Sequence, residues 1–166
     1  MQPEAPAAPL NGSFSGRVQF VGLLRSALEQ AAREGWPELI LSDATFEDWP
    51  LAEAATVESL QQWAKPGRRM VMLAARFDRV QRDQPRFVAW RKANSHLIDC
   101  RLCSADAADG PPSALWSPKW FLQRTDLEAC AGVYGVDRRR WMAVREAIGI
   151  SLRASRPGFP VTTLGL

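Results

Sequence analysis

The chain of 166 residues contains a single histidine, His96. Imidazole moves protons near neutral pH, activates serine or cysteine nucleophiles and binds metal ions. One copy excludes every site that needs two histidines of the same chain. Together with Cys100, Cys103 and Cys130, His96 gives a formal Cys3His set of zinc ligands.

Cys100 and Cys103 also form a CxxC pattern, which is typical of redox pairs and of metal sites. A redox pair of the thioredoxin type lies at a helix N-terminus, whereas this pattern ends a predicted strand. The two cysteines are an odd number of residues apart, so they should face opposite sides of that strand. We therefore expect buried or incidental thiols, no metal and no cofactor, with the zinc set as the alternative. An odd, sparse set of cysteines also favours a reducing compartment, and thus the cytoplasm.

Two carboxylates, Asp43 and Asp48, flank the predicted loop DATFEDWP directly after an apolar strand. In open α/β sheets the carboxyl ends of the strands are the usual place for ligands. Paired carboxylates there suit acid–base catalysis or Mg²⁺ binding, although Asp is equally common as a turn former. Arg76 and Arg124 also follow predicted strands, and they are candidates for an anion site at the same edge.

Basic side chains are concentrated in the middle of the chain. Residues 1–64 carry three basic and nine acidic side chains, a net charge of −6, whereas residues 65–101 carry ten and three, a net charge of +7. The stretch 76–92 interleaves arginines with Phe87 and Trp90, a composition that suits phosphate contact and base stacking. Its candidate anion- or partner-binding residues are Arg76, Arg79, Arg82, Arg86 and Arg91. A second cluster, Arg138 to Arg140, begins the last predicted helix, where positive charge opposes the helix dipole and suggests an external anion.

Helices and strands alternate in the predicted order. Helical spacing of apolar residues predicts helices at about 20–33, 53–64, 76–94 (interrupted near Pro85) and 138–152, the last one capped by Asp137. Apolar runs predict strands at 38–42, 69–75, 97–102, 120–123 and 131–136. This alternation predicts an α/β fold: one domain with a mostly parallel, mixed sheet of about five to six strands flanked by helices. We place a flexible segment at residues 1–15, the domain at 16–155 and an extended apolar tail at 156–166.

The run helix–ELILSDATF–helix–RMVMLAA–helix–SHLIDCRL, followed by KWFLQRT, GVYGV and a final helix, resembles a phospholipase D-like α/β domain. It is most similar to uncharacterised bacterial domains of that fold that lack the catalytic signature H-x-K-x4-D. His96 is followed by Leu97 and Ile98, so the lysine two positions later is missing. Lys119 has Ser117 in place of the nucleophile. The resemblance implies the fold but not phosphodiester hydrolysis.

The sequence therefore predicts a non-catalytic binding or regulatory module of phospholipase D-like fold. Two alternatives stay open: nucleic-acid or nucleotide binding through the basic 76–92 stretch, and an enzyme that uses Asp43 and Asp48. The uneven charge permits an anionic partner or a self-complementary dimer, although solvated helix faces that neutralise one another within the monomer explain it more simply. The expected partner is a protein or a second copy of the chain, and nucleic acid is a possible partner. No apolar stretch approaches the ~20 residues that a membrane span needs, so no membrane partner is expected. The N-terminal segment has no signal-peptide pattern.

Overall fold

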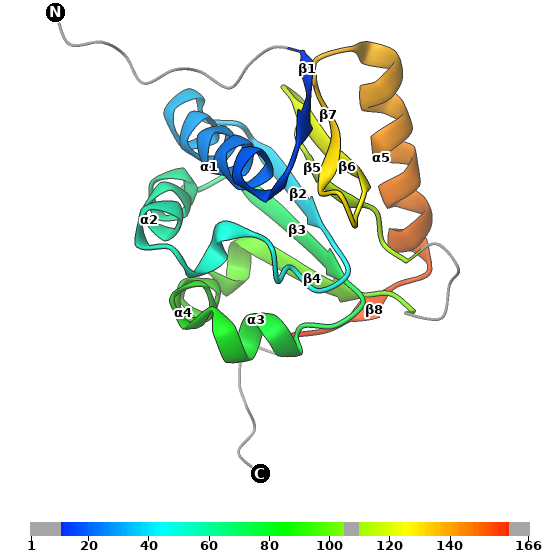
Figure 1. Ribbon diagram of the computed structural model, residues 1–166. Coiled ribbons are helices and arrows are strands. Elements are labelled where there is room, and N and C mark those ends of the chain that lie inside the picture. Colours follow the sequence, from blue (N-terminus) through cyan, green and yellow to red (C-terminus); the bar gives the residue numbers. More distant parts are fainter. Residues whose placement is uncertain (1–10, 105–109, 160–166) are drawn as a thin grey trace, which may run out of the picture.

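A single mixed sheet forms the centre of the computed structural model, which describes residues 11–104 and 110–159. The sheet has eight strands in the order β1-β7-β6-β5-β2-β3-β4-β8. Figure 1 shows helices α1 to α4 on one face of the sheet and α5 on the other. The predicted α/β class is therefore confirmed.

The parallel part of the sheet is built from three strands joined by two crossover connections. Strands β2, β3 and β4 lie side by side and parallel, and each is a short run with a buried centre. Right-handed packing of the intervening helices covers one face of these strands. The bounds are α1 Arg17–Glu34, β2 Glu38–Ser42, α2 Ala54–Trp63, β3 Arg69–Ala74, α3 Asp78–Asp83, α4 Pro85–Ala93 and β4 Ile98–Leu102, with single 3₁₀ turns at Pro50–Ala52 and Ser95–Leu97.

The rest of the sheet is antiparallel. Strands β5, β6 and β7 form a meander that joins the free edge of β2, and the first strand of the chain pairs with β7. A two-residue strand near the end of the chain pairs with β4 on the opposite edge. The bounds are β1 Gly12–Ser15, β5 Ser113–Trp116, β6 Phe121–Asp126, β7 Ala131–Gly135, α5 Arg138–Arg153 and β8 Arg156–Pro157.

Two apolar layers separate the sheet from its helices. The alternation of side chains along β3 places Met70 and Met72 in the large layer under α1 to α4, whereas Val71 and Leu73 face the smaller layer under α5. Strand β3 is thus covered on both sides, which explains its continuous apolar sequence. No helix among the described residues is long and apolar enough to cross a bilayer.

The structure corrects several boundaries. The sheet has eight strands instead of five to six, and within the described chain only β2, β3 and β4 are mutually parallel. β1 lies in the segment expected to be flexible, and β8 lies in the expected tail. Both strands are short. Their sequences lack an alternating apolar pattern because most of their side chains are exposed. Residues 1–10 and 160–166 lie outside the described part.

The close approach of β6 and β7 requires a residue without a side chain at Gly132. A Cβ there would overlap the backbone carbonyl oxygen of Gln123 and would lie 2.9 Å from the Cα of Arg124. This contact occurs at the irregular register between Arg124 and Asp126. Gly132 therefore allows β6 to carry Arg124 to its position at the end of the sheet.

Replacing Gly132 with alanine should destabilise the fold by about 2 kcal/mol or more, because a methyl group has to displace backbone atoms. Urea unfolding followed by tryptophan fluorescence measures this change. Gly22→Ala is the matched control: it lies inside α1, where a Cβ meets nothing within 4 Å, so it should stabilise by about 0.5–1 kcal/mol. Equal unfolding midpoints for the two variants would contradict the close-approach explanation.

Candidate functional site

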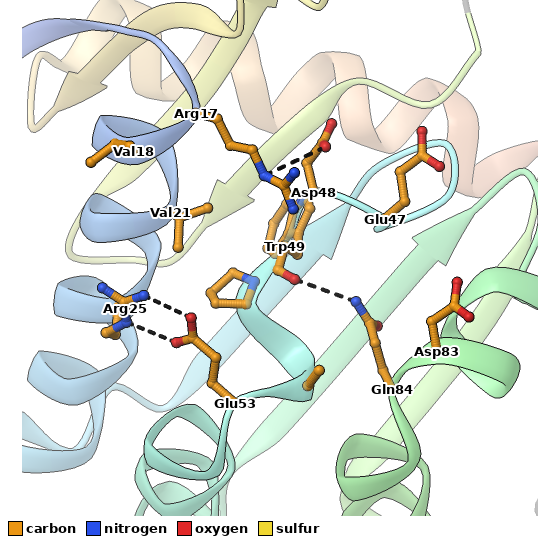
Figure 2. A pocket seen from close by; sticks show the side chains of 12 residues that line it. Arg17, Val18, Val21, Arg25, Glu47, Asp48, Trp49, Glu53, Asp83 and Gln84 are labelled. Atoms are coloured by element: carbon orange, nitrogen blue, oxygen red, sulfur yellow. Dashed lines mark hydrogen bonds and ion pairs between the residues drawn. The ribbon is translucent and has the colours of Figure 1, made fainter.

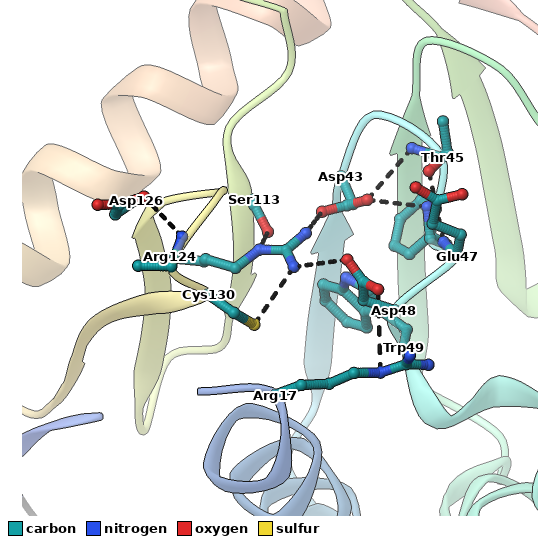
Figure 3. A network of polar contacts seen from close by, with 12 residues as sticks. Arg17, Asp43, Thr45, Glu47, Asp48, Trp49, Ser113, Arg124, Asp126 and Cys130 are labelled. Atoms are coloured by element: carbon teal, nitrogen blue, oxygen red, sulfur yellow. Dashed lines mark hydrogen bonds and ion pairs between the residues drawn. The ribbon is translucent and has the colours of Figure 1, made fainter. Parts of the chain in front are cut away.

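The carboxyl end of the parallel strands contains a buried ion network centred on Arg124 of β6. Its Nη2 donates to Oδ1 of Asp43 at 2.9 Å, its Nη1 donates to Oδ2 of Asp48 at 2.9 Å, and its Nε donates to Oγ of Ser113 at 3.0 Å. Figure 3 shows these groups converging on one guanidinium, which Cys130 also contacts through its sulfur. The side chains of Arg124 and Asp43 are 5% and 4% exposed.

Local backbone geometry explains why Asp43 occupies its position. The second carboxylate oxygen of Asp43 accepts the backbone N–H groups of Thr45 at 3.2 Å and Phe46 at 2.8 Å. This is the turn-forming behaviour expected of Asp after a strand, and it supports Phe46, which has a φ of 60°. Asp43 therefore has two roles: one carboxylate oxygen fixes the loop and the other binds Arg124.

Every carboxylate oxygen in this network has a partner. Oδ1 of Asp48 lies 3.9 Å from Nε of Arg17, and the other three oxygens accept from Arg124 or from the turn. Burial alone would lower the pKa of the Arg124 guanidinium, but its contacts with Cys130, Asp48 and Asp43 outweigh burial and raise that pKa. The Phe20 ring lies under the guanidinium, 4.5 Å from its central carbon. Asp43 and Asp48 thus share the single positive charge of Arg124, and Arg17 lies near the other oxygen of Asp48, an arrangement that suits a structural role better than proton transfer.

The sequence analysis placed these residues at one sheet edge, and the structure confirms it for Asp43, Asp48 and Arg124. Arg76 differs. Only its backbone N–H contacts the edge, at the carbonyl oxygen of Ala44, and its side chain is exposed. Whether any of the four binds a ligand stays a prediction.

Next to the network, a surface hollow of about 480 Å³ opens between the start of α1, the loop after β2 and the α3–α4 junction. Figure 2 shows Arg25 in a double hydrogen bond with Glu53, at 2.8 and 2.7 Å. That bond raises the pKa of Arg25 and lowers the pKa of Glu53. The charged lining consists of two arginines against four carboxylates: Arg17, Arg25, Glu47, Asp48, Glu53 and Asp83. The hollow therefore repels phosphate groups.

Most arginines of the 76–92 stretch are engaged within the protein. Arg79 lies 3.8 Å from Glu47 and 3.9 Å from Asp83, and Arg82 lies 3.3 Å from Asp83. Arg86 donates to the backbone oxygen of Ala52 at 2.9 Å. These arginines are exposed. Arg79 contacts Glu47 of the acidic first part of the chain, whereas Arg82 pairs with Asp83 of its own stretch.

Arg91 does not face solvent, which corrects its assignment as an anion- or partner-binding residue. It is 5% exposed and donates to the sulfur of Cys100 at 3.1 Å and to the carbonyl oxygen of Phe159 at 2.9 Å. Its guanidinium also lies over the Phe159 ring, 5.4 Å from the centroid. Arg91 thus attaches the end of the described chain to the core.

The alternative Cys3His zinc set is not assembled. Cys100 lies in the apolar layer under α1 to α4 and Cys103 in the layer under α5, as their odd spacing predicts. Cys130 contacts Arg124, while His96 is exposed in a hollow next to Arg68, Arg69 and Asp99. Among residues 11–104 and 110–159, no group of three or more His, Cys, Asp or Glu side chains is placed to hold a metal ion.

Helix α5 carries arginines that form no ion pair among the described residues. Arg138, Arg145 and Arg153 are seven and eight residues apart, about two helical turns each, so they follow one side of the helix. Within the described ranges none of the three forms an ion pair with a carboxylate. We call these three residues the α5 stripe. The cluster Arg138 to Arg140 was expected from the sequence, whereas Arg145 and Arg153 were not, although their helical spacing from Arg138 indicates a common side of the helix.

Replacing Arg124 with methionine should cost about 3–5 kcal/mol of unfolding free energy, because it leaves a buried carboxylate without its partner. Arg17→Met is the matched control. Its ion pair with Asp48 is long and its side chain is 66% exposed, so the expected loss is below about 1 kcal/mol. Chemical denaturation measures both variants. Similar losses in the two would show that the network does not hold the fold.

The thiols of Cys100 and Cys103 should react slowly with iodoacetamide at neutral pH. Burial raises the pKa of both thiols, and the Arg91 guanidinium offsets this only in part at Cys100, so little thiolate is present. Mass spectrometry of native and urea-unfolded protein checks the prediction. Rapid labelling of the native protein, or a Cys100–Cys103 disulfide formed without unfolding, would restore the redox interpretation.

No family model and no curated protein matches the chain. Among solved structures it is similar to TrmBL2, described as an archaeal chromatin protein that shows a novel mode of DNA binding. The two chains share 14% sequence identity with a TM-score of 0.64 over 93% of this chain and 56% of TrmBL2. This chain thus spans about half the length of that protein, and the likeness establishes a shared fold.

Proposed function

We propose that this chain is a non-catalytic, phospholipase D-like module that binds nucleic acid through the α5 stripe. The observation that carries the proposal is the alignment of Arg138, Arg145 and Arg153 along one side of α5 without a carboxylate partner among the described residues. Unneutralised like charges on one helix side repel one another, and a polyanion relieves that repulsion.

The spacing of the stripe suits a phosphate backbone. A helix rises 1.5 Å per residue, so neighbouring stripe residues are about 10 to 12 Å apart along the axis. That distance corresponds to about three phosphates of one DNA strand, which follow each other at 3.4 Å along the duplex axis. Arg139 and Met142 are exposed on the same helix. Figure 1 shows α5 on the outside of the sheet, so an extended partner can reach its length.

Other surfaces are less suitable for phosphate. The hollow at the sheet edge carries more carboxylates than arginines, and the arginines of the 76–92 stretch pair with Glu47, Asp83 and a backbone carbonyl. The shared fold with TrmBL2, a chromatin protein described as binding DNA, supports the proposal. The phospholipase D-like part of the proposal rests on the resemblance of the sequence.

Exchange of Arg138, Arg145 and Arg153 for glutamine should weaken binding of a labelled duplex DNA by at least about tenfold at low salt. It should also reduce the slope of log K against log salt by about 2.7, because each phosphate contact contributes about 0.9. Fluorescence anisotropy across a salt series measures both quantities. The triple variant Arg79→Gln, Arg82→Gln, Arg86→Gln is the matched control, because it removes the same charge. If the control loses as much affinity as the stripe variant, the α5 assignment is wrong.

A protein partner is the second candidate, and exposed apolar side chains favour it. Leu127 and Ile150 are 61% and 58% exposed and line a hollow of about 580 Å³ between the β6–β7 turn and α5. Light scattering of wild type and Ile150→Ser tests the homodimer. If the wild type is a dimer and Ile150→Ser is a monomer, the homodimer is supported. If the wild type is a monomer, the homodimer is ruled out.

A further inference from the structure

We propose that Arg145 and Arg153 form a discrete phosphate-binding site above Gly149, at the end of the α5 stripe. This inference rests on the proposed function and names the chemical group that this part of the stripe binds. Phosphate suits two guanidinium groups because each can donate parallel N–H bonds to its oxygens.

The two guanidinium groups converge on one point. A Cβ at Gly149 would lie 3.4 Å from Nη1 of Arg145 and 3.5 Å from Nη1 of Arg153. Both guanidinium groups would thus be in van der Waals contact with a methyl group placed at Gly149. Like charges brought this close without a carboxylate between them repel each other, and an anion at that point converts repulsion into attraction.

Packing fixes the orientation of Arg145. Its guanidinium carbon lies 5.4 Å from the centroid of the Trp116 ring. Trp116 in turn stacks on Trp141, with ring centroids 5.1 Å apart, and donates from Nε1 to the carbonyl oxygen of Trp141 at 3.1 Å. A guanidinium stacked on an aromatic ring keeps its N–H edge available for an anion. Little conformational entropy is therefore lost when that edge binds.

Gly149 supplies the space that the anion needs. Glycine inside a helix costs about 0.5–1 kcal/mol relative to alanine, and α5 carries this cost at the one position where a side chain would enter the meeting point. A surface recess of about 370 Å³ opens here, lined by Trp141, Met142, Arg145, Glu146, Gly149 and Arg153. Glu146 forms no ion pair with either arginine, so it leaves them unneutralised while lowering the net charge of the recess.

The phosphate has two sources with the same chemistry: a phosphodiester of the nucleic-acid backbone and a free phosphate. The probes are therefore inorganic phosphate and the dinucleotide TpT, which carries one phosphodiester. NMR of the arginine Nε–Hε groups of the full chain follows each titration. Saturable shifts are expected at Arg145 and Arg153, with smaller and non-saturating shifts at Arg138.

The decisive variant is Gly149→Ala. Its methyl group occupies the meeting point, so phosphate affinity should fall by about tenfold, while the better helix propensity of alanine should keep the thermal midpoint at or above that of wild type. Gly22→Ala is the matched control and should leave phosphate affinity unchanged. Glu146→Gln should increase the affinity, because it removes the one carboxylate of the recess.

The outcomes separate this inference from the proposed function. If Gly149→Ala binds phosphate and DNA like wild type while the stripe variant loses DNA, the site is wrong and the function stands. If DNA does not bind but inorganic phosphate saturates Arg145 and Arg153, the site stands and the ligand is a free phosphate. Shifts of equal size at all exposed arginines overturn the site.

Discussion

The buried guanidinium of Arg124 is the ion-pair centre that reinforces the junction between the two parts of the sheet, which the pairing of β2 with β5 joins. Arg124 belongs to the antiparallel meander, whereas Asp43 and Asp48 belong to the loop that follows the first parallel strand. Their ion pairs join the two parts at the end of the sheet where crossover loops are longest. A buried charge pair of this kind adds little net stability compared with apolar residues, but losing one partner is costly. The network therefore specifies how the loop sits more than it strengthens the core.

This arrangement also has a functional consequence. The carboxyl end of parallel strands is where α/β proteins usually bind ligands. Here its two carboxylates both pair with Arg124, a group that does not titrate in the physiological range. His96 lies in a separate hollow next to Arg68 and Arg69. Asp43 and Asp48 are thus paired with an arginine, and His96 lies apart from them.

Local patterns predicted those parts of the structure that depend on neighbours in sequence. The apolar run of β2 gave the observed bounds 38–42, and the cap of α5 is Asp137, whose side chain accepts the N–H of Arg140. The rule for strand ends brought Asp43 and Arg124 together correctly. Strand β1 was missed because Phe14 is its one buried residue, so no alternation marks it. Arg91 was misread because arginine is rarely buried, and its partner Phe159 is distant in sequence.

The arginines show why charge density in a sequence does not by itself locate a binding surface. Residues 76–92 are the densest basic stretch, yet Arg79 and Arg82 face carboxylates and Arg91 faces a backbone oxygen and a thiol. Along α5, charges two turns apart align only after the helix has formed, and the inward side of that helix is occupied by Val144 and Ile148. Tertiary contacts thus pair several arginines of the dense 76–92 stretch, whereas the widely spaced arginines of α5 form no ion pair among the described residues. Like charges without a carboxylate between them oppose the compact state of the isolated domain, and a ligand of opposite charge relieves that repulsion.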